Sequence, residues 1–425
     1  MKLLIKNGRI IDPANKINRV SDILLENGKV SKLAKDIKPN GAEAIDAKGM
    51  IVAPGLFDMH THVRQPGRED AEDFITASCA AAKGGFTSIT AMPNTNPVCD
   101  NRGIVEYIIS ESRGNAIINI FPIGAITKAQ KGEDLAELAD MKDAGVVAVS
   151  DDGSSVKNAQ LMRKALEYSN MFNVPVISHC EDLNLSQGGV MNEGLTSTLL
   201  GLLGIPNISE SCIVARDIAL ANFTKAKLHI AHVSTKESVE LIRQAKEKGI
   251  NVTCETCPHY FTLTDETVKG FDTNAKINPP LRTKEDRKAI MGGLKDGTID
   301  VIATDHAPHT EADKDIEFDL APFGIIGLET ALSLAINELV DKKIIKWDEL
   351  IKKMSYIPSE ILGLTNKGRL SIGADADVVI IDPDKKFKFA KETIVSKSKN
   401  SPFIGRNFKG CAVVTICRGK VVYKA

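Results

Sequence analysis

The chain has 425 residues, of which 43% are hydrophobic and 26% are charged, and its formal net charge is −1. This composition suits a globular protein with one large and one smaller domain, and the near-zero charge favours neither a nucleic-acid nor a membrane partner. No apolar run approaches the ~20 residues that a membrane helix needs, and the start of the chain lacks a secretory signal. The scattered cysteines favour reduced thiols in the cytoplasm.

Both ends of the chain consist of short strand-like runs. Within residues 2–34, Asn7-Gly8 and Asn27-Gly28 separate alternating apolar runs, and each pair is a strong hairpin signal. Near the other end, Arg418-Gly419 predicts a turn between further strands. Two all-β ends around a different middle predict one composite β-sandwich domain, made of residues 1–52 plus 365–425.

The middle of the chain, residues 53–364, alternates strands and helices. Strand-like runs lie near residues 51–58, 86–92, 115–124, 146–150, 174–178, 227–231, 251–255 and 299–304. Helix-like segments follow near 69–83, 100–112, 133–144, 158–172, 209–225, 235–249, 284–296 and 326–340. Eight β/α pairs predict a (β/α)8 TIM-like barrel. A doubly wound open sheet is the alternative, but no glycine-rich dinucleotide fingerprint follows the first strand.

Unusual polar residues follow the predicted barrel strands, where the active site of such a barrel gathers. The first strand ends in His60, His62 and Arg64, which share one face because side chains alternate along a strand. The other candidates are Asn94, Asp151 or Asp152, His179, His232, Asp305 and His309. Imidazole and carboxylate ligands without a thiolate suit zinc or another borderline divalent ion. Six ligands exceed one tetrahedral site, so two metal ions are expected.

The same alternation sorts the ambiguous candidates. His229 and His232 should lie on opposite faces, so at most one of them points inward, and we choose His232. His306 is opposite in face to Asp305 and is interpreted as structural. His259 remains ambiguous, and periodicity does not decide between Asp151 and Asp152.

Several stretches together resemble the amidohydrolase superfamily and, within it, the dihydroorotases of the long bacterial type. The H-x-H pair with a late aspartate marks the superfamily, whereas Arg64 and the two stretches around Asn94 and Phe323 are more specific. The matching stretches are residues 58–67, 92–95, 150–153, 179–182, 231–234, 303–309 and 321–325. The resemblance covers essentially the whole chain.

The resemblance implies a role for each candidate. His60 and His62 would bind the more buried zinc, Asp152 would bridge both ions, and His179 and His232 would bind the second. Asp305 would contact a metal and act as the general acid/base. The substrate-binding set would be Arg64, Asn94, Asn278, His309, and the backbone of Phe323 and Gly324. One departure is Gln65, which stands where the family usually has an acidic residue.

The implied chemistry fits these residue types. Opening a cyclic amide needs an ionised water and a polarised carbonyl, both of which metal ions provide. The leaving ring nitrogen needs a proton, which Asp305 would relay from the water. A substrate carboxylate needs a fixed cation, which Arg64 supplies. The implied reaction is the reversible, zinc-dependent cyclisation of N-carbamoyl-L-aspartate to L-dihydroorotate, the third step of de novo pyrimidine synthesis.

Two other functions compete with this one. Dihydropyrimidinase, hydantoinase and allantoinase generally bridge their metals through a carboxylated lysine after the fourth strand, but residues 144–150 contain no lysine. A metal-free scaffold for a transcarbamylase partner is less favoured, because a full set of ligands seldom persists as core residues.

Three further expectations concern partners and motion. A small-molecule substrate is expected, without nucleic acid or membrane. The resemblance implies a homodimer and a possible association with aspartate transcarbamylase. The charged loop 310–323 is interpreted as a surface loop or, more sharply, as a mobile lid that closes on substrate.

Overall fold

A computed structural model describes residues 2–425, and its middle part is a nearly closed barrel of eight parallel strands. The strands are β6 (Leu56–Asp58), β7 (Phe86–Ala91), β8 (Asn119–Gly124), β9 (Ala148–Ser150), β10 (Val176–Ser178), β13 (Leu228–Ile230), β14 (Val252–Thr256) and β15 (Val301–Ile302). A parallel bridge between Thr61 and His306 joins the first strand to the last. All eight predicted strands are therefore confirmed, and with them the barrel.

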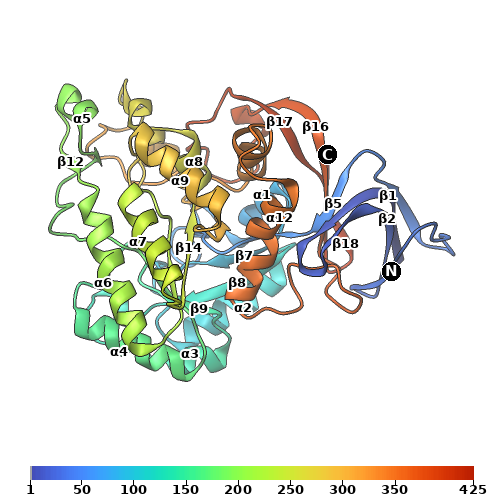
Figure 1. Ribbon diagram of the computed structural model, residues 1–425, viewed down its shortest axis with the longest axis horizontal. Helices are drawn as coiled ribbons and strands as arrows, with labels where there is room; N and C mark the ends of the chain where they lie inside the picture. The colour runs from blue at the N-terminus through green and yellow to red at the C-terminus, as the bar shows by residue number, and fades with distance from the viewer. Residues whose placement is uncertain (1) are drawn as a thin grey trace.

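Helices follow the strands and cover the outside of the barrel (Figure 1). Those predicted from the sequence are α1 (Phe74–Gly84), α2 (Arg102–Asn115), α3 (Leu138–Ala144), α4 (Ala159–Met171), α6 (Ile208–Thr224), α7 (Lys236–Glu247), α9 (Lys284–Asp296) and α11 (Ala331–Ala335). Helix α4 is typical: it buries Leu161, Met162, Ala165 and Leu166, one stripe at helical spacing. Its N-terminus is capped by the side chain of Asn158.

Shorter elements complete the chain. They are β11 (Met191–Asn192), α5 (Leu195–Leu200), β12 (Gly204–Ile205), α8 (Pro258–Thr262), α10 (Glu311–Lys314), α12 (Trp347–Ile351) and α13 (Ile357–Ile361). Two π-helical turns, Ile336–Val340 and Lys352–Tyr356, continue α11 and α12. No helix within residues 2–425 has the length and apolar character needed to cross a membrane.

The strands from both chain ends form a second eight-stranded sheet on one side of the molecule (Figure 1). They are β1 (Lys2–Asp12), β2 (Ile17–Glu26), β3 (Lys29–Ala34), β4 (Glu43–Asp46), β5 (Ile51–Pro54), β16 (Val378–Lys388), β17 (Asn407–Cys417) and β18 (Lys420–Lys424). Strands β1, β2, β16 and β17 enclose a separate small core that includes Leu3, Ile23, Ile380 and Ile416. The composite β architecture is confirmed. The exact domain limits, 1–52 plus 365–425 for the terminal domain and 53–364 for the barrel, stay a proposal.

One of the three turns expected in the terminal strands needs correction. Asn27-Gly28 and Arg418-Gly419 do form tight turns, between β2 and β3 and between β17 and β18. Asn7-Gly8, however, is a bulge inside β1 and not a hairpin. Asn7 has a φ of +61°, a conformation that a bulge needs as much as a turn does.

The expected strand 51–58 is divided at Gly55 between the two sheets. Its first part, β5, pairs with β1 and β16 of the terminal sheet, and its second part, β6, begins the barrel. A Cβ on Gly55 would lie 2.1 Å from Oγ1 of Thr87, so only glycine allows the chain to pass β7 here. The segment that leads to His60 and His62 is thus anchored in the terminal sheet.

Candidate active site

A cavity of about 350 Å³ opens where the barrel strands end, and the predicted site residues gather around it. Eleven of the twelve residues proposed from the sequence line this cavity: His62, Arg64, Asn94, Asp152, His179, His232, Asn278, Asp305, His309, Phe323 and Gly324. The twelfth, His60, is fully buried and lies next to Asp152 and Asp305. The structure therefore brings together residues that follow seven of the eight barrel strands.

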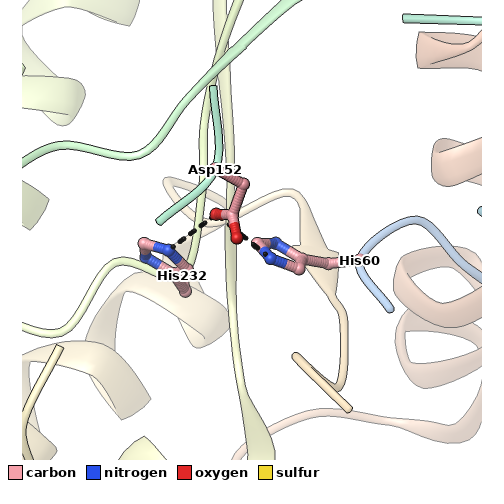
Figure 2. A group of neighbouring side chains, drawn as sticks. All are labelled: His60, Asp152 and His232. Atoms are coloured by element: carbon pink, nitrogen blue, oxygen red, sulfur yellow. Dashed lines mark ion pairs between the residues drawn. The ribbon is translucent and has the colours of Figure 1, made fainter. Parts of the chain in front are cut away.

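Asp152 lies at the centre of the cluster. Its Oδ1 atom is 3.4 Å from Nε2 of His60, from Nδ1 of His179 and from Nε2 of His232. Figure 2 shows the carboxylate between the rings of His60 and His232. Its other oxygen, Oδ2, is 3.4 Å from Nε2 of His62. One carboxylate thus faces four imidazoles, which is the arrangement a bridging ligand needs.

Asp305 closes the cluster on the side of the first strand. Its Oδ1 atom lies 3.0 Å from Nε2 of His62 and 3.5 Å from Nε2 of His60. Two groups of donor atoms, each within 4.8 Å of one another, result: His60, Asp152 and His232, and His60, His62 and Asp305.

The outward ring nitrogens of three histidines each meet an oxygen atom. Nδ1 of His60 lies 2.5 Å from Glu255, Nδ1 of His62 lies 2.8 Å from Oδ1 of Asn94, and Nε2 of His179 lies 3.0 Å from Glu181. An oxygen acceptor on one side of an imidazole holds the proton there and leaves the opposite nitrogen free as a ligand.

The unsatisfied atoms of the cluster are those that a cation would satisfy. Nε2 of His60 and Oδ1 of Asp152 are buried without a hydrogen-bond partner, although buried polar atoms are normally paired. Nδ1 of His179 and Nε2 of His232 face each other at 2.8 Å. The donor set is nitrogen and carboxylate oxygen only, which fits zinc and related divalent ions.

The electrostatic field of the cluster is negative. Although burial opposes it, the nearby carboxylates of Asp152, Glu255 and Asp305 raise the pKa of His60 well above its ordinary value. Hydrogen bonds that His179 donates to Asp152 and Glu181 outweigh its burial and raise its pKa to about 10. A site that attracts protons this strongly attracts a divalent cation for the same reason.

Three of the site residues have a left-handed backbone. The φ angles of Arg64, His232 and Asp305 are +66°, +32° and +49°. Such conformations are rare outside glycine and cluster where function over-determines the geometry. They also explain why the alternation of side chains between the two faces of a strand does not continue past the strand ends.

The prediction that at most one of His229 and His232 points inward is wrong. His229 is fully buried and its Nε2 lies 3.2 Å from Oε2 of Glu255, whose other oxygen contacts His60. Strand β13 ends at Ile230, and the left-handed backbone of His232 turns this side chain inward as well. Only His232 reaches the cluster, as expected.

Sequence reasoning missed Glu255 and Glu181. Glu255 is fully buried in β14 and holds both His60 and His229. A lone carboxylate within a short buried strand was the available signal, because such a charge needs a partner. Glu181 is nine-tenths buried directly behind His179, and hydrogen bonding to that histidine, despite burial, lowers its pKa to about 2.

The ambiguous residues are also placed. Asp151 turns away from the cluster and accepts hydrogen bonds from the backbone N–H groups of Ile126 and Thr127. Nδ1 of His306 accepts from the backbone N–H of Gly327, and its Nε2 lies 3.4 Å from Glu72. His259 is buried against Tyr260, and its Nε2 has no partner among the described residues.

A cationic side chain, Arg64, lines the same cavity as the cluster. Arg64 donates from Nε to the carbonyl oxygen of Pro308, and its Nη2 lies 3.4 Å from Nε2 of His309. Burial lowers the pKa of Arg64 to about 10, so it remains a cation at neutral pH. The carbonyl oxygen of Phe323 accepts from Nε2 of His309 at 2.8 Å. The cavity is therefore lined by an arginine as well as by a cluster of carboxylates and imidazoles.

Gln65 supports the segment that carries Arg64. Its Oε1 accepts from the backbone N–H of Phe74, the first residue of α1, and its Nε2 donates to the hydroxyl of Tyr107. The amide thus does what a carboxylate would do at a helix N-terminus, without adding a charge beside Arg64.

Comparison with known proteins agrees with this geometry. Residues 49–238 match the family model described as dihydro-orotase-like, and residues 223–423 match an amidohydrolase family model. The chain is 55% identical to a dihydroorotase from Geotalea daltonii, with 100% of both chains covered, and 53% identical to one from Acetivibrio thermocellus, with 99% of both covered. The chain belongs to the dihydroorotase family.

Similar solved structures come from related cyclic amidases. The L-hydantoinase (dihydropyrimidinase) from Arthrobacter aurescens is 26% identical with a TM-score of 0.90, over 99% of this chain and 96% of that one. The dihydropyrimidinase from Brevibacillus agri is 25% identical with a TM-score of 0.88, over 100% and 95%. The dihydroorotase family thus shares its barrel and terminal sheet with hydantoinases.

Proposed function

We propose that this protein is a metal-dependent dihydroorotase that interconverts N-carbamoyl-L-aspartate and L-dihydroorotate in pyrimidine biosynthesis. The observation that carries this proposal is the single cavity that has Arg64 and Asn94 beside the cluster around Asp152. A cation and a hydrolytic centre in one cavity suit a cyclic amide that carries a carboxylate.

We further propose that the cluster holds two zinc ions. His60, His62 and Asp305 would hold one ion, His179 and His232 would hold the other, and Asp152 would contact both. When bound, such ions polarise the amide carbonyl and lower the pKa of a water molecule. The unpartnered atoms of His60 and Asp152 support this assignment.

Arg64 would bind the substrate carboxylate. It is half-buried at the cavity wall, and its guanidinium is fixed by the carbonyl of Pro308, so its orientation is set before substrate arrives. Asn94 presents its NH2 group to the cavity, because its oxygen faces His62. His309 and the backbone of Phe323 and Gly324 would close the same side of the ring.

Asp305 would carry the proton. In hydrolysis, the bond between the carbonyl carbon and the ring nitrogen breaks, and a bond from that carbon to the water oxygen forms. Asp305 takes one proton from the water and delivers it to the departing nitrogen, and the reverse transfer accompanies cyclisation. Its position at the edge of the cluster, in contact with both His60 and His62, supports this role.

The test is hydrolysis of L-dihydroorotate beside dihydrouracil, hydantoin and allantoin, each with chelator and with zinc added back. Turnover of dihydroorotate alone, lost with chelator and restored by zinc, is expected. Turnover of the neutral rings instead would leave Arg64 without its proposed role and would favour a hydantoinase. No turnover even with zinc would favour a scaffold.

The remaining proposals concern the setting of the enzyme. All eight cysteines are free thiols, which supports a cytoplasmic location. We propose a homodimer and an association with aspartate transcarbamylase, on the family resemblance alone. Sedimentation of the pure protein, and co-elution with the transcarbamylase, test the two assemblies.

A further inference from the structure

Glu181 contacts two residues that line the cavity without lining it itself. Its Oε2 atom lies 3.0 Å from Nε2 of His179 and accepts a hydrogen bond of 2.9 Å from Nδ2 of Asn278. His179 belongs to the cluster around Asp152 and directly follows β10, whereas Asn278 lies far along the chain, in the loop before α9. One buried carboxylate oxygen therefore connects the two.

The chemistry of Glu181 decides which way the amide of Asn278 points. A carboxylate only accepts hydrogen bonds, so the group facing it must be the NH2 and not the carbonyl oxygen. The NH2 of Asn278 makes the bond to Glu181, and its Oδ1 accepts none from residues 2–425. Because Asn278 lines the cavity, this oxygen is left as an acceptor for whatever enters.

Asn94 has the opposite polarity. Its oxygen faces Nδ1 of His62, which bears the proton when Nε2 faces the metal cluster. Its NH2 group is then a donor toward the cavity. Two asparagines of one cavity thus offer complementary groups, a donor beside Arg64 for a carboxylate and an acceptor at Asn278 for an N–H.

We propose that Glu181 is a positioning residue that fixes the carbonyl oxygen of Asn278 toward the cavity, where it accepts a hydrogen bond from an N–H group of the substrate. The same carboxylate fixes the tautomer of His179, so its nitrogen Nδ1 faces the metal cluster. This inference rests on the proposed function, because it assigns the recognition of the substrate N–H to that same site. Substrate specificity and metal binding are therefore linked through one side chain.

The test removes the acceptor behind Asn278 and, separately, replaces its amide. In Glu181→Ala, the NH2 of Asn278 loses its acceptor, so the amide of Asn278 is free to turn and offer the substrate a donor. In Asn278→Asp, the new carboxylate is repelled by Glu181 and leaves the position of the amide. Each single variant should raise the KM for dihydroorotate about tenfold, the size of one lost hydrogen bond.

The double variant Glu181→Ala with Asn278→Asp restores the acceptor. The new aspartate no longer faces a carboxylate, and because both of its oxygens accept hydrogen bonds, it needs no partner to hold an acceptor toward the cavity. Its KM should return to within about threefold of the wild-type value, which independent effects at neighbouring sites would not produce. All four proteins are assayed with saturating zinc, and their zinc content is measured.

The matched control is Glu329→Ala, at another glutamate with a buried side chain, which binds Lys83 and the backbone of Val395 and Ser396. It should leave KM unchanged. A double variant whose KM equals the product of the two single effects would overturn the inference, as would unchanged KM in both single variants. Failure of the wild type to hydrolyse dihydroorotate would instead overturn the proposed function, so the two failures are distinguishable.

Discussion

At the scale of single residues, the site depends on side chains that hold other side chains. Asp152 faces four imidazoles, and three of these are oriented from behind by Glu255, Asn94 and Glu181. Such outer contacts fix both the ring orientation and the tautomer of a metal ligand. A residue that never touches substrate can therefore control both metal affinity and turnover.

Replacing Asp305 with asparagine should separate metal binding from proton transfer. The amide keeps a ligand oxygen near His62 but does not carry a proton between water and the ring nitrogen. Zinc content should remain close to wild type, while kcat for dihydroorotate should fall by about 10²- to 10⁴-fold. Metal analysis and steady-state kinetics on the same preparation check this. Full turnover with intact zinc would remove Asp305 from the proton relay.

Replacing Glu255 with glutamine should weaken metal binding. The variant keeps the size of the side chain but loses the charge that holds His60 and His229. Outer contacts of this kind contribute about 10- to 100-fold in metal affinity. Competition with a chelator measures the change. Glu72→Gln is the control, because Glu72 is equally buried but contacts His306, outside the cluster.

Much of this residue-level arrangement could be read from the sequence. His60, His62 and Asp305 stand out because charged and imidazole groups after apolar strands have few other uses, whereas only the family resemblance selects Asp152 over Asp151. The sequence does not reveal the roles of Glu255, Glu181 and the inward His229, since these roles depend on which strands become neighbours in space. The left-handed backbone of His232 likewise has no signature in the local sequence.

At the scale of elements, two lysines connect the loop 310–323 to the segment before Asn278. Nζ of Lys314 donates to the carbonyl oxygens of Thr273 and Pro322, and Nζ of Lys276 donates to those of Phe318 and Asp319. The backbone N–H of Gly324 also donates to the carbonyl of Lys276. If the loop is the lid proposed from the sequence, ligand should protect residues 310–323 from proteases.

Burial of Lys314 predicts a pH dependence of stability. Burial lowers its pKa from 10.5 to about 7, so the folded protein binds fewer protons than the unfolded chain between these values. Its contribution to the free energy of unfolding should therefore rise with pH from about 7 to 10, by at most about 1.4 kcal/mol per pH unit. Denaturant unfolding of wild type and Lys314→Met across this range measures the difference. If the free energies of unfolding of the two proteins change in parallel between pH 7 and 10, Lys314 does not titrate in this range.

The hydrophobic periodicity of the sequence predicts the order and number of the elements. It does not predict where a continuous apolar run passes from one sheet to the other. Residues 51–58 read as one apolar run because both sheets bury it. The division at Gly55 depends on the close approach of Thr87, a contact between segments that the sequence does not align. The short insertion of β11, α5 and β12 also gave no clear pattern.

At the scale of the whole molecule, the barrel and the terminal sheet share a continuous core. The largest buried cluster includes Ile11, Val379 and Ala412 of the terminal sheet together with Leu56, Phe86 and Ile89 of the barrel. This shared core suits a protein that unfolds as one unit, even though its two sheets were predicted as separate domains.

Metal removal should therefore destabilise the entire chain. An ion that binds only the folded state stabilises it by about 4 kcal/mol at a thousandfold excess over its Kd. Chelation should lower the Tm in a single transition, and zinc should restore it. In Asp152→Asn, which removes the central charge, chelator should change the Tm much less. An equal fall in both proteins would point to an effect of the chelator elsewhere.

The division at Gly55 has a consequence for the order in which the protein assembles during synthesis. Strand β5, which leads directly into the segment bearing His60 and His62, pairs with β1 on one side and with β16 on the other. Because β16 begins at Val378, that segment acquires its second neighbour only when nearly the whole chain has left the ribosome. His60 and His62 are therefore synthesised early, but the strand before them is fully paired only late. The catalytic centre of the nascent barrel should be complete only after β16 of the terminal sheet has been synthesised.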